Sequence, residues 1–246
     1  GGKITTVAPT AAFTAPAEVR RIDGSGKTLV PGLWDSHKHF DNEYDLLANV
    51  ATGMTSIRSP GNRPEDARRV QQRRAAGEIV APEAFVAAIV DRKDPLSAQS
   101  AELVSSEAET LAAVRRIKDA GLWGVKFYTS MNPAWIAPAA AEAHRLGLRV
   151  LGHVPAGMRP LEAVQAGYDE LTHINFVLMQ AMPQSVVDVA NTAARFEGPA
   201  EFARTVDLDS PAIKAFVAEL AERMIWVDPT IVVFERSFTH DTPELG

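Results

Sequence analysis

The chain has 246 residues, of which 46% are hydrophobic and 23% are charged, a composition typical of a folded globular domain and not of a disordered or fibrous chain. Lys and Arg number 25 against 31 Asp and Glu, which gives a formal charge of −6, and the basic residues are scattered. We therefore expect neither nucleic acid nor an anionic membrane surface as a partner. The lack of cysteine excludes disulfides, thiolate zinc sites and cysteine nucleophiles, so His, Asp, Glu and Lys are the candidate ligands and catalysts.

No segment is expected to span a membrane. The most apolar stretch, residues 224–234, is shorter than the roughly 20 residues that a transmembrane helix needs, and Asp228 and Pro229 interrupt it. The first ten residues lack a charged start followed by an apolar run, so we expect no signal peptide in this chain. A chain without cysteine fits the cytoplasm and the periplasm equally, and the localisation stays open.

Residues 1–30 contain turn residues and short β-branched runs at 4–7, 19–22 and 28–30. Such runs are typical of strands, although they are too few for a complete domain. We therefore predict a partial β-sandwich element over residues 1–30, as a remnant of a small N-terminal β element, and a second domain over residues 31–246.

After Pro31 a unit recurs that alternates a helical stretch with a short apolar run. The helical stretches are rich in Ala, Glu and Arg, and each ends at a glycine in the place of a helix C-cap. The glycines are Gly53, Gly121, Gly147 and Gly167. Helices that alternate with buried strands predict an α/β fold with a parallel sheet.

Seven strands are predicted, at residues 33–35, 55–58, 84–89, 124–128, 149–153, 170–173 and 224–229. Six repeats between residues 33 and 227 give about 32 residues per unit, in the range of a strand with its crossover helix. The pattern predicts a TIM-type (β/α)8 barrel. By extrapolation an eighth strand falls near residue 260, so we expect this chain to lack it.

Polar residues that can bind metal end three successive predicted strands. Lys126 lies five residues after its cap glycine, and His153 and His173 each lie six residues after theirs. In a (β/α)8 barrel the carboxyl ends of the strands meet at one mouth, where the chemistry takes place. His37 and His39 follow the first strand two residues apart, so an extended segment points both rings to one side. Two imidazoles on one side suit an ion such as Zn²⁺.

Four segments together resemble the amidohydrolase superfamily of metal-dependent hydrolases, most closely its prolidase-like and imidazolonepropionase-like branch. They are KTLVPGLWDSHKHF at 27–40, GVKFY at 124–128, LGHVPAG at 151–157 and ELTHINF at 170–176. The likeness runs from about residue 22 to residue 234, in the same order along the chain.

The resemblance implies a binuclear metal centre with two divalent ions, for which zinc is the first expectation. In it His37 and His39 hold the more buried ion, His153 and His173 hold the more exposed one, and a carboxylated Lys126 bridges both. The chemistry agrees, because an ammonium with a pKa of about 10.4 would repel two dications, whereas addition of CO2 gives an anionic carbamate with two ligand oxygens.

The resemblance also implies an enzyme that cleaves an amide-type C–N bond in a dipeptide or a small cyclic amide, with a metal-bound hydroxide as nucleophile. Two alternatives stay open. A lactonase or phosphotriesterase would use the same site, and a catalytically silent metal-binding fragment would lack the Asp that such families place at the end of the eighth strand. The mononuclear deaminase branch is disfavoured, because its members use no bridging lysine. A homo-oligomer is compatible with the sequence.

Two residues are candidates for contact with the substrate. Tyr128, two residues beyond Lys126, shares its strand face and is a candidate donor to a substrate carbonyl or a developing oxyanion, with a packed tyrosine as the alternative. Arg58, which ends the second strand, is a candidate partner for a substrate carboxylate, with an ordinary salt bridge as the alternative.

Other polar residues have weaker functional readings. Two roles are open for Asp35: it either orients a ligand histidine or has a structural role at the end of the strand. Asp228 is read as a turn-former before Pro229, in preference to the missing base, and Asp241 lies in the tail. His144 is expected to be exposed on a helix, and His240 is expected to be a tail residue.

Overall fold

The computed structural model describes residues 3–239 of a chain that divides into two compact units, Gly1–Pro31 and Gly32–Gly246. In residues 3–31 the first unit contains a single 3-10 turn, η1 (Thr10–Ala12), and no strand. The apolar residues Val7, Ile22 and Leu29 are 89%, 81% and 92% exposed. Isolated short strands are not stable without neighbours and an apolar face to pack on. The runs at 4–7, 19–22 and 28–30 therefore form no strand in the described residues. The assignment of residues 1–30 to a partial β-sandwich element stays a prediction.

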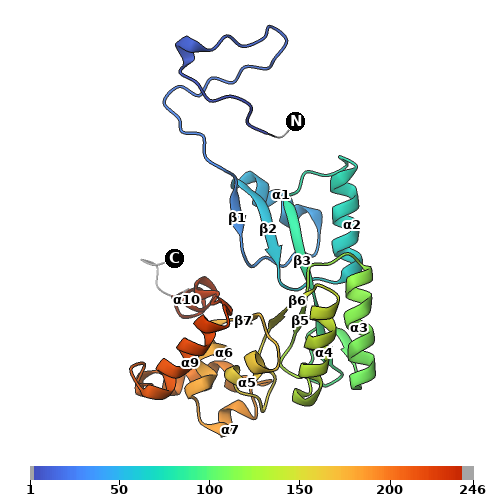
Figure 1. Ribbon diagram of the computed structural model, residues 1–246, viewed down its shortest axis with the longest axis vertical. Helices are drawn as coiled ribbons and strands as arrows, with labels where there is room; N and C mark the ends of the chain where they lie inside the picture. Colours follow the sequence, from blue (N-terminus) through green and yellow to red (C-terminus); the bar gives the residue numbers. More distant parts are fainter. Residues whose placement is uncertain (1–2, 240–246) are drawn as a thin grey trace. The chain divides into compact units, whose positions relative to one another are not determined.

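The second unit is built on a curled parallel sheet (Figure 1). Its strands are β1 (Leu33–Asp35), β2 (Met54–Ser59), β3 (Glu83–Arg92), β4 (Glu102–Val104), β5 (Gly124–Phe127), β6 (Arg149–Gly152), β7 (Glu170–Thr172) and β8 (Trp226–Asp228). All neighbouring strands are parallel, in the order β1-β2-β3-β5-β6-β7-β8, and β4 pairs with the end of β3 off this path. The seven predicted strands are thus confirmed as an incomplete (β/α)8 barrel. The sequence analysis missed only β4 among the described strands.

Except between β3 and β4, helices connect consecutive strands, and they cover the outer face of the sheet. They are α1 (Glu43–Ala51), α2 (Pro64–Ala75), α3 (Glu107–Asp119), α4 (Pro133–Arg145), α5 (Pro160–Gln165), α6 (Ile174–Leu178), α7 (Gln184–Val187), α8 (Ala194–Phe202), α9 (Pro211–Glu222) and α10 (Ile231–Thr239), with 3-10 turns η2 (Met179–Ala181) and η3 (Ala203–Thr205). Helix α2 packs on β3, α3 on β5 and α4 on β6, and α3 and α4 also pack on each other (Figure 1). None of the described helices is long and apolar enough to cross a bilayer.

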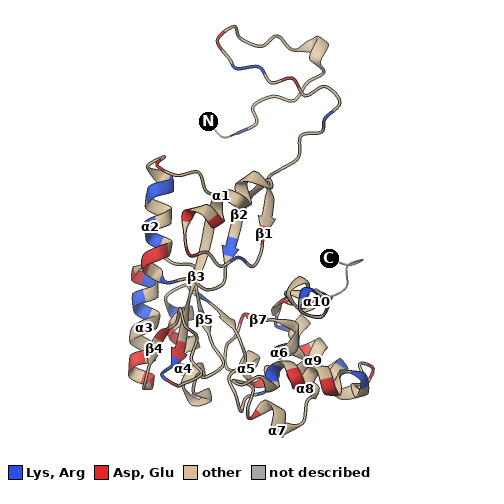
Figure 2. Ribbon diagram, turned by 180° about the vertical axis from the view of Figure 1, so that it is seen from behind, with Lys and Arg blue, Asp and Glu red and all other residues tan. Residues whose placement is uncertain are grey.

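The predicted cap glycines follow helices α1, α3, α4 and α5. Each lies one residue beyond the C-cap and has a positive φ, for example 73° at both Gly121 and Gly147. A left-handed residue at this position ends the helix and turns the chain toward the next strand. The outer helices carry charges of both signs, as α2 and α3 show in Figure 2.

Alternation along β5 separates the hydrophobic core from the barrel interior. Val125 and Phe127 are fully buried in the core between sheet and helices, together with Ile117 of α3 and Ile136 of α4. Lys126, between them in sequence, therefore faces the opposite side of the strand. It is 1% exposed and lines a cavity on the inner face.

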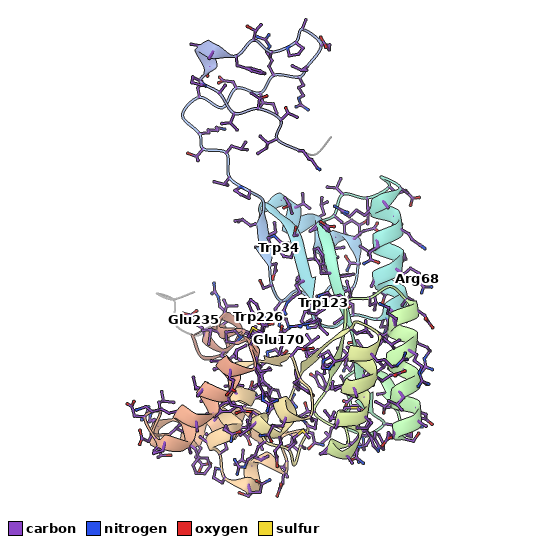
Figure 3. All side chains as sticks on the ribbon, viewed as in Figure 1. Trp34, Arg68, Trp123, Glu170, Trp226 and Glu235 are labelled. Atoms are coloured by element: carbon purple, nitrogen blue, oxygen red, sulfur yellow. The ribbon has the colours of Figure 1, made fainter. Side chains whose placement is uncertain are left out.

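Among the described strands, β1 and β8 each pair on one side only. Both carry exposed tryptophans, with Trp34 57% and Trp226 67% exposed (Figure 3). The ring of Trp34 stacks on Phe85 of β3 at a centroid distance of 5.2 Å. The apolar surface at these two strands is thus only partly covered within the described residues.

Candidate metal centre

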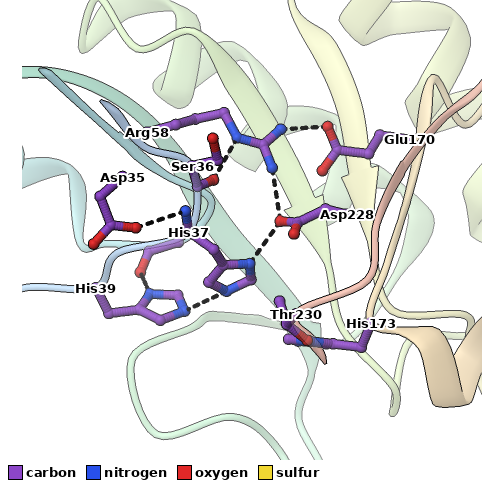
Figure 4. Close-up of polar contacts among 10 residues, drawn as sticks. Asp35, Ser36, His37, His39, Arg58, Glu170, His173, Asp228 and Thr230 are labelled. Atoms are coloured by element: carbon purple, nitrogen blue, oxygen red, sulfur yellow. Dashed lines mark hydrogen bonds and ion pairs between the residues drawn. The ribbon is translucent and has the colours of Figure 1, made fainter. Parts of the chain in front are cut away.

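His37 and His39 lie on the segment that leaves β1, and the surrounding backbone fixes this segment. Asp35 accepts a hydrogen bond from the backbone N–H of His37 at 3.1 Å, and the N–H of Lys38 donates to the Arg58 carbonyl at 3.0 Å. The Nε2 atoms of His37 and His39 lie 3.2 Å apart (Figure 4). The expected convergence of the two rings is therefore present, and Asp35 supports the segment through its backbone.

The other ring nitrogen of each of these two histidines has its own partner. Nδ1 of His37 lies 2.7 Å from Oδ2 of Asp228, and Nδ1 of His39 donates to the Gly61 carbonyl at 2.5 Å. A Cβ at Gly61 would lie 2.5 Å from Ile89 and 3.2 Å from the His39 ring, so only glycine lets this carbonyl approach so closely. Each ring is held by Nδ1 while Nε2 faces the other histidine.

His153 and His173 follow the same pattern. Nδ1 of His153 lies 3.0 Å from the hydroxyl of Thr129, and Nδ1 of His173 lies 2.7 Å from the hydroxyl of Thr230. Nε2 of His153 is buried and has no hydrogen-bond partner among the described residues. Burial of such a nitrogen without a partner is costly, so this atom is a candidate ligand position.

The backbone is strained where His173 and Thr230 meet. Their φ angles are 70° and 48°, in the left-handed region that residues with a Cβ rarely adopt. Such conformations cost on the order of 1–3 kcal/mol each and occur preferentially at functional sites. The backbone N–H groups of His173 and Ile174 donate to the carbonyls of Asp228 and Pro229 at 2.7 and 3.1 Å, which ties this corner to β8.

The four histidines form one connected group, which we call the histidine cluster: His37, His39, His153 and His173. Ring centroids are 5.1 Å apart for His37 and His39, 5.1 Å for His37 and His173, and 4.8 Å for His153 and His173. A cavity of about 320 Å³ adjoins it and is lined by His39, Ile89, Ala98, Gln99, Ser100, Lys126, Tyr128, His153 and His173. The structure thus brings together all five residues expected to bind metal, with Tyr128 beside them.

Burial and the nearby positive charge of Lys126 keep His39, His153 and His173 neutral. Burial, with a contribution from Lys126, lowers the pKa of His39 to about 4 and that of His173 to about 3, and it lowers the pKa of His153 well below its ordinary value. A neutral imidazole is the form that binds a metal ion. At neutral pH these three rings therefore present nitrogen donors and not cations.

Lys126 is the other perturbed group on the inner face. Burial lowers its pKa to about 8, while the negative charges of Asp228 and Glu170 oppose this effect. Its Nζ lies 5.9 Å from the ring centroid of Tyr128, and that ring lies 3.9 Å from the ring of His153. A larger fraction of Lys126 is therefore in the nucleophilic amine form at neutral pH than for an exposed lysine.

Arg58 lies behind the histidine cluster with its guanidinium already paired. Nη1 pairs with Glu170, Nη2 lies 2.7 Å from Asp228, and Nε donates to the Ser36 carbonyl at 2.8 Å (Figure 4). The guanidinium also lies 5.8 Å from the ring centroid of Trp123. These contacts correspond to the salt-bridge alternative, and a role of Arg58 in binding substrate stays a prediction.

The reading of Asp228 as a simple turn-former needs correction. Its carboxylate, 11% exposed, joins His37 to Arg58. Burial alone would raise the pKa of Asp228, but the hydrogen bond from His37 and the charges of His37 and Arg58 hold it below its ordinary value. Asp228 is thus an ionised residue that positions His37, and neither the missing base nor a turn-former describes it fully.

Several partners were not foreseen from the sequence. Glu170, Thr129, Gly61 and Thr230 hold site residues, although none of the four was expected from the sequence to have such a role. A charged residue at the start of a short buried strand, as in ELT of β7, is the one signal that could have pointed to Glu170.

The remaining candidate residues lie apart from the cluster or outside the described part. His144 is exposed on α4, as expected, and lies 3.1 Å from Asp169. His240 and Asp241 lie outside the described residues.

The donors of the histidine cluster have the chemistry of metal ligands, but not yet the arrangement of a closed site. As the side chains stand, no group of three or more His, Cys, Asp or Glu in the described residues is arranged to hold an ion. The Nε2 atoms of His37 and His39 lie 3.2 Å apart, a separation at which both nitrogens can lie about 2.0–2.1 Å from one zinc ion. The chemistry of the donors nevertheless fits: ligand histidines bind through one nitrogen while a protein acceptor holds the other, and all four members of the cluster have such a partner.

Three solved structures illustrate what the chain resembles. A protein from Bifidobacterium longum assigned as a prolidase shares 24% identity over 68% of this chain and 46% of its own, with a TM-score of 0.56. Bottromycin amidohydrolase shares 24% identity over 71% of this chain and 38% of its own, with a TM-score of 0.55. A prolidase complexed with N-methylphosphonate-L-proline shares 18% identity over 87% of this chain and 70% of its own, with a TM-score of 0.54.

The first two of these proteins are more than twice as long as the part that this chain matches. No protein-family model and no curated protein matches the sequence. The structural likeness agrees with the strand order, the parallel pairing and the half-barrel described above. The chain therefore has the prolidase-like fold of the amidohydrolase superfamily.

Proposed function

We propose that this chain forms the metal-binding part of a hydrolase that cleaves an amide-type C–N bond. The observation that carries the proposal is the histidine cluster, in which every Nδ1 is held by a different protein group and the buried Nε2 of His153 is without a partner in the described residues. The fold supports it, since proteins of similar structure include prolidases and an amidohydrolase.

In this proposal His37 and His39 hold one divalent ion, His153 and His173 hold a second, and a carboxylated Lys126 bridges the two. When bound, such ions supply Lewis acidity toward a carbonyl oxygen and lower the pKa of water, and the imidazole ligands favour zinc. Asp228, Gly61, Thr129 and Thr230 keep the rings oriented by holding Nδ1.

The buried environment of Lys126 favours the carbamate. The ammonium first loses a proton to give the neutral amine, which attacks CO2, and a second proton leaves to solvent as the new N–C bond forms. The two lost protons and the added CO2 convert a cationic side chain into an anionic one. A pKa of about 8 makes the amine form accessible at neutral pH. Carboxylation removes a positive charge that acts on His39, His153 and His173.

The cavity on the inner face suits a small substrate such as a dipeptide, an N-acyl amino acid or a small cyclic amide. Tyr128 lines this cavity with Lys126 and is the candidate hydroxyl donor to the carbonyl oxygen as negative charge develops. Its ring packs on His153, so the hydroxyl is carried by a side chain with restricted motion.

The test combines metal content with turnover. The full chain is loaded with Zn²⁺ in bicarbonate buffer, and hydrolysis is measured on dipeptides and N-acyl amino acids, with a lactone and a phosphotriester for comparison. We expect close to two zinc ions per chain and amide hydrolysis that a chelator abolishes. His153→Gln should lower the zinc content toward one ion per chain and remove the activity. His144→Gln, which changes an exposed histidine outside the cluster, should change neither. Zinc binding without turnover would support a silent metal-binding protein, and turnover of the lactone or phosphotriester alone would support the other alternative.

A further inference from the structure

Asp91, near the end of β3, carries a buried carboxylate that the candidate metal centre does not use. Its side chain is 0% exposed, and it forms no ion pair among the described residues. The neighbouring guanidinium of Arg92 pairs with Asp94 instead, at 2.8 Å. Aspartate is almost never fully buried without a charged partner, so the groups around this carboxylate indicate what it does.

Backbone N–H groups from a strand, a loop and a turn surround the Asp91 carboxylate. Oδ1 accepts from the N–H of Arg92 in β3, and Oδ2 accepts from the N–H of Ala98 in the loop between β3 and β4, both at 3.0 Å. The N–H of Ser130, in the turn between β5 and α4, also donates to this carboxylate. One side chain thus joins three backbone segments at a single buried point.

The β3–β4 loop (residues 93–101) forms a wall of the cavity beside the histidine cluster. Ala98, Gln99 and Ser100 line that cavity of about 320 Å³. Gln99 and Ser100 also line a neighbouring cavity of about 320 Å³, and His39 lines both. The position of this loop therefore sets the shape of two cavities that meet at His39.

The first half of the loop, residues 93–97, is held by its own turn. The Ser97 hydroxyl donates to the Arg92 carbonyl at 2.7 Å and accepts from the Asp94 N–H at 2.8 Å. Residues 98–100, which line the cavities, depend on Asp91. In the contacts of the described residues, the bond from the Ala98 N–H to Asp91 is the one hydrogen bond that ties residues 98–100 to β3.

The carboxylate occupies this place at a cost. Burial raises the pKa of Asp91 to about 6, and the negative charge of Asp94 adds to the rise, while the three N–H donors oppose it. A neutral amide of the same size would avoid this cost, but it has only one acceptor oxygen. Arg92 and Ala98 each take one oxygen, so the junction needs the two acceptors of a carboxylate.

We propose that Asp91 is a positioning residue whose carboxylate holds the β3–β4 loop in place as the wall between the two cavities. Without the second acceptor oxygen, the cavity-lining half of the loop leaves its place while the sheet stays folded. The inference goes beyond the proposed function and does not rest on it, because it concerns the metal-free chain as well.

The experiment measures amide hydrogen exchange by NMR in the metal-free chain. The Ala98 amide donates to Asp91 itself, whereas the Ala101 amide donates to the Ala98 carbonyl at 3.2 Å and therefore reports on the loop. Exchange in β5 and β6 reports opening of the sheet. A hydrogen bond to a charged group corresponds to roughly a 10- to 100-fold change in an equilibrium constant. In Asp91→Ala, exchange at Ala98 and Ala101 should rise by about that factor relative to β5 and β6, and in Asp91→Asn it should rise less.

Asp169→Asn is the matched control. The Asp169 carboxylate also accepts a backbone N–H, that of Val150 at 2.7 Å, but it lies between α5 and β7, away from the loop. This variant should speed exchange at Val150 and leave Ala98 and Ala101 as in the wild type.

Each result decides the inference. Faster exchange at Ala98 and Ala101 together, beyond that of β5 and β6, supports it. Faster exchange at Ala98 alone, an equal rise in loop and sheet, no change, or the same rise at Ala101 in Asp169→Asn overturns it. If Asp91→Ala does not fold, Asp91→Asn is judged by the same comparison.

Turnover gives a second comparison, which uses the proposed function. The loop is a cavity wall and supplies no candidate metal ligand, so Asp91→Asn should raise KM for a dipeptide and leave kcat and zinc content within about twofold of the wild type. A fall in kcat at unchanged KM would overturn the positioning role. A wild-type chain without hydrolysis would contradict the proposed function alone, and hydrogen exchange would then decide this inference.

Discussion

Replacement of Asp228 by Asn tests whether the carboxylate positions His37. Oδ2 of Asp228 lies 2.7 Å from Nδ1 of His37 and 2.7 Å from Nη2 of Arg58, and the side chain is 11% exposed. Asn preserves the shape and one acceptor but removes the charge. Hydrogen bonds to charged groups contribute about 1.5–3 kcal/mol, so the free energy of unfolding should fall by about that amount. Because an anchor of this kind also sets the orientation of a ligand ring, zinc affinity should fall roughly 10- to 100-fold.

The stability lost in Asp228→Asn should depend on pH. The folded-state pKa of Asp228 lies below the ordinary value of 3.8, so its contribution to stability is complete above that value and is lost as the pH falls through the lower folded-state pKa. The stability difference between wild type and Asp228→Asn should therefore be full at pH 7 and shrink below about pH 4.

The assays are urea unfolding at several pH values and competitive zinc titration. Glu170→Gln is the matched control, since it removes the other carboxylate partner of Arg58 and leaves the pair of His37 and Asp228 intact. It should lower stability while zinc affinity stays within about twofold of the wild type. The reasoning is refuted if Asp228→Asn binds zinc as tightly as the wild type, or if both variants lose affinity equally.

Three further predictions concern the same site. In metal-free protein, the folded-state pKa values of His39 and His173 are lowered, so the contribution of these two rings to stability is complete above about pH 6.5 and decreases as the pH falls toward about 3. The urea midpoint of unfolding should therefore drop between pH 7 and pH 4. A midpoint that does not change with pH would contradict the burial of these rings. Lys126→Met should abolish any dependence of zinc binding on bicarbonate, and it should remove the carbamate carbon signal in 13C NMR. Equal zinc binding by the wild type with and without bicarbonate would argue against a carboxylated Lys126 between the two ions. Gly61→Ala should cost roughly 1–3 kcal/mol in thermal unfolding, because its Cβ would overlap Ile89, and unchanged stability would show that the loop has room to move.

The strand order could be predicted from the sequence because its signals are local. A cap glycine, a short apolar run and a polar residue at the strand end recur at nearly constant spacing, and each needs only neighbouring residues to be recognised. Strand β4 was missed because three residues, ELV, pair with the far end of β3 and leave no periodic pattern. The runs before residue 31 have the composition of strands, but β propensity alone forms no strand without a partner.

The candidate ligands could also be predicted, whereas the groups that hold them could not. His37 and Asp228 are 191 residues apart, and Arg58 and Glu170 are 112 residues apart. Nothing in either local sequence indicates that the two will meet. The pairing follows from the curvature of the sheet, which a pattern of strands and helices does not specify.

These long-range pairs link the site to the shape of the sheet. Strands β1 and β8 do not pair with each other in the described residues, yet His37 and Arg58 from the side of β1 and β2 contact Asp228 and Glu170 of β8 and β7. The half-barrel is therefore held in its curve partly by the polar contacts that orient the histidine cluster. Because Arg58 pairs with both carboxylates, a double replacement of Asp228 and Glu170 should deviate from additivity in stability by roughly 0.5–3 kcal/mol. Metal affinity and the stability of the sheet should for the same reason change together in variants of Asp228.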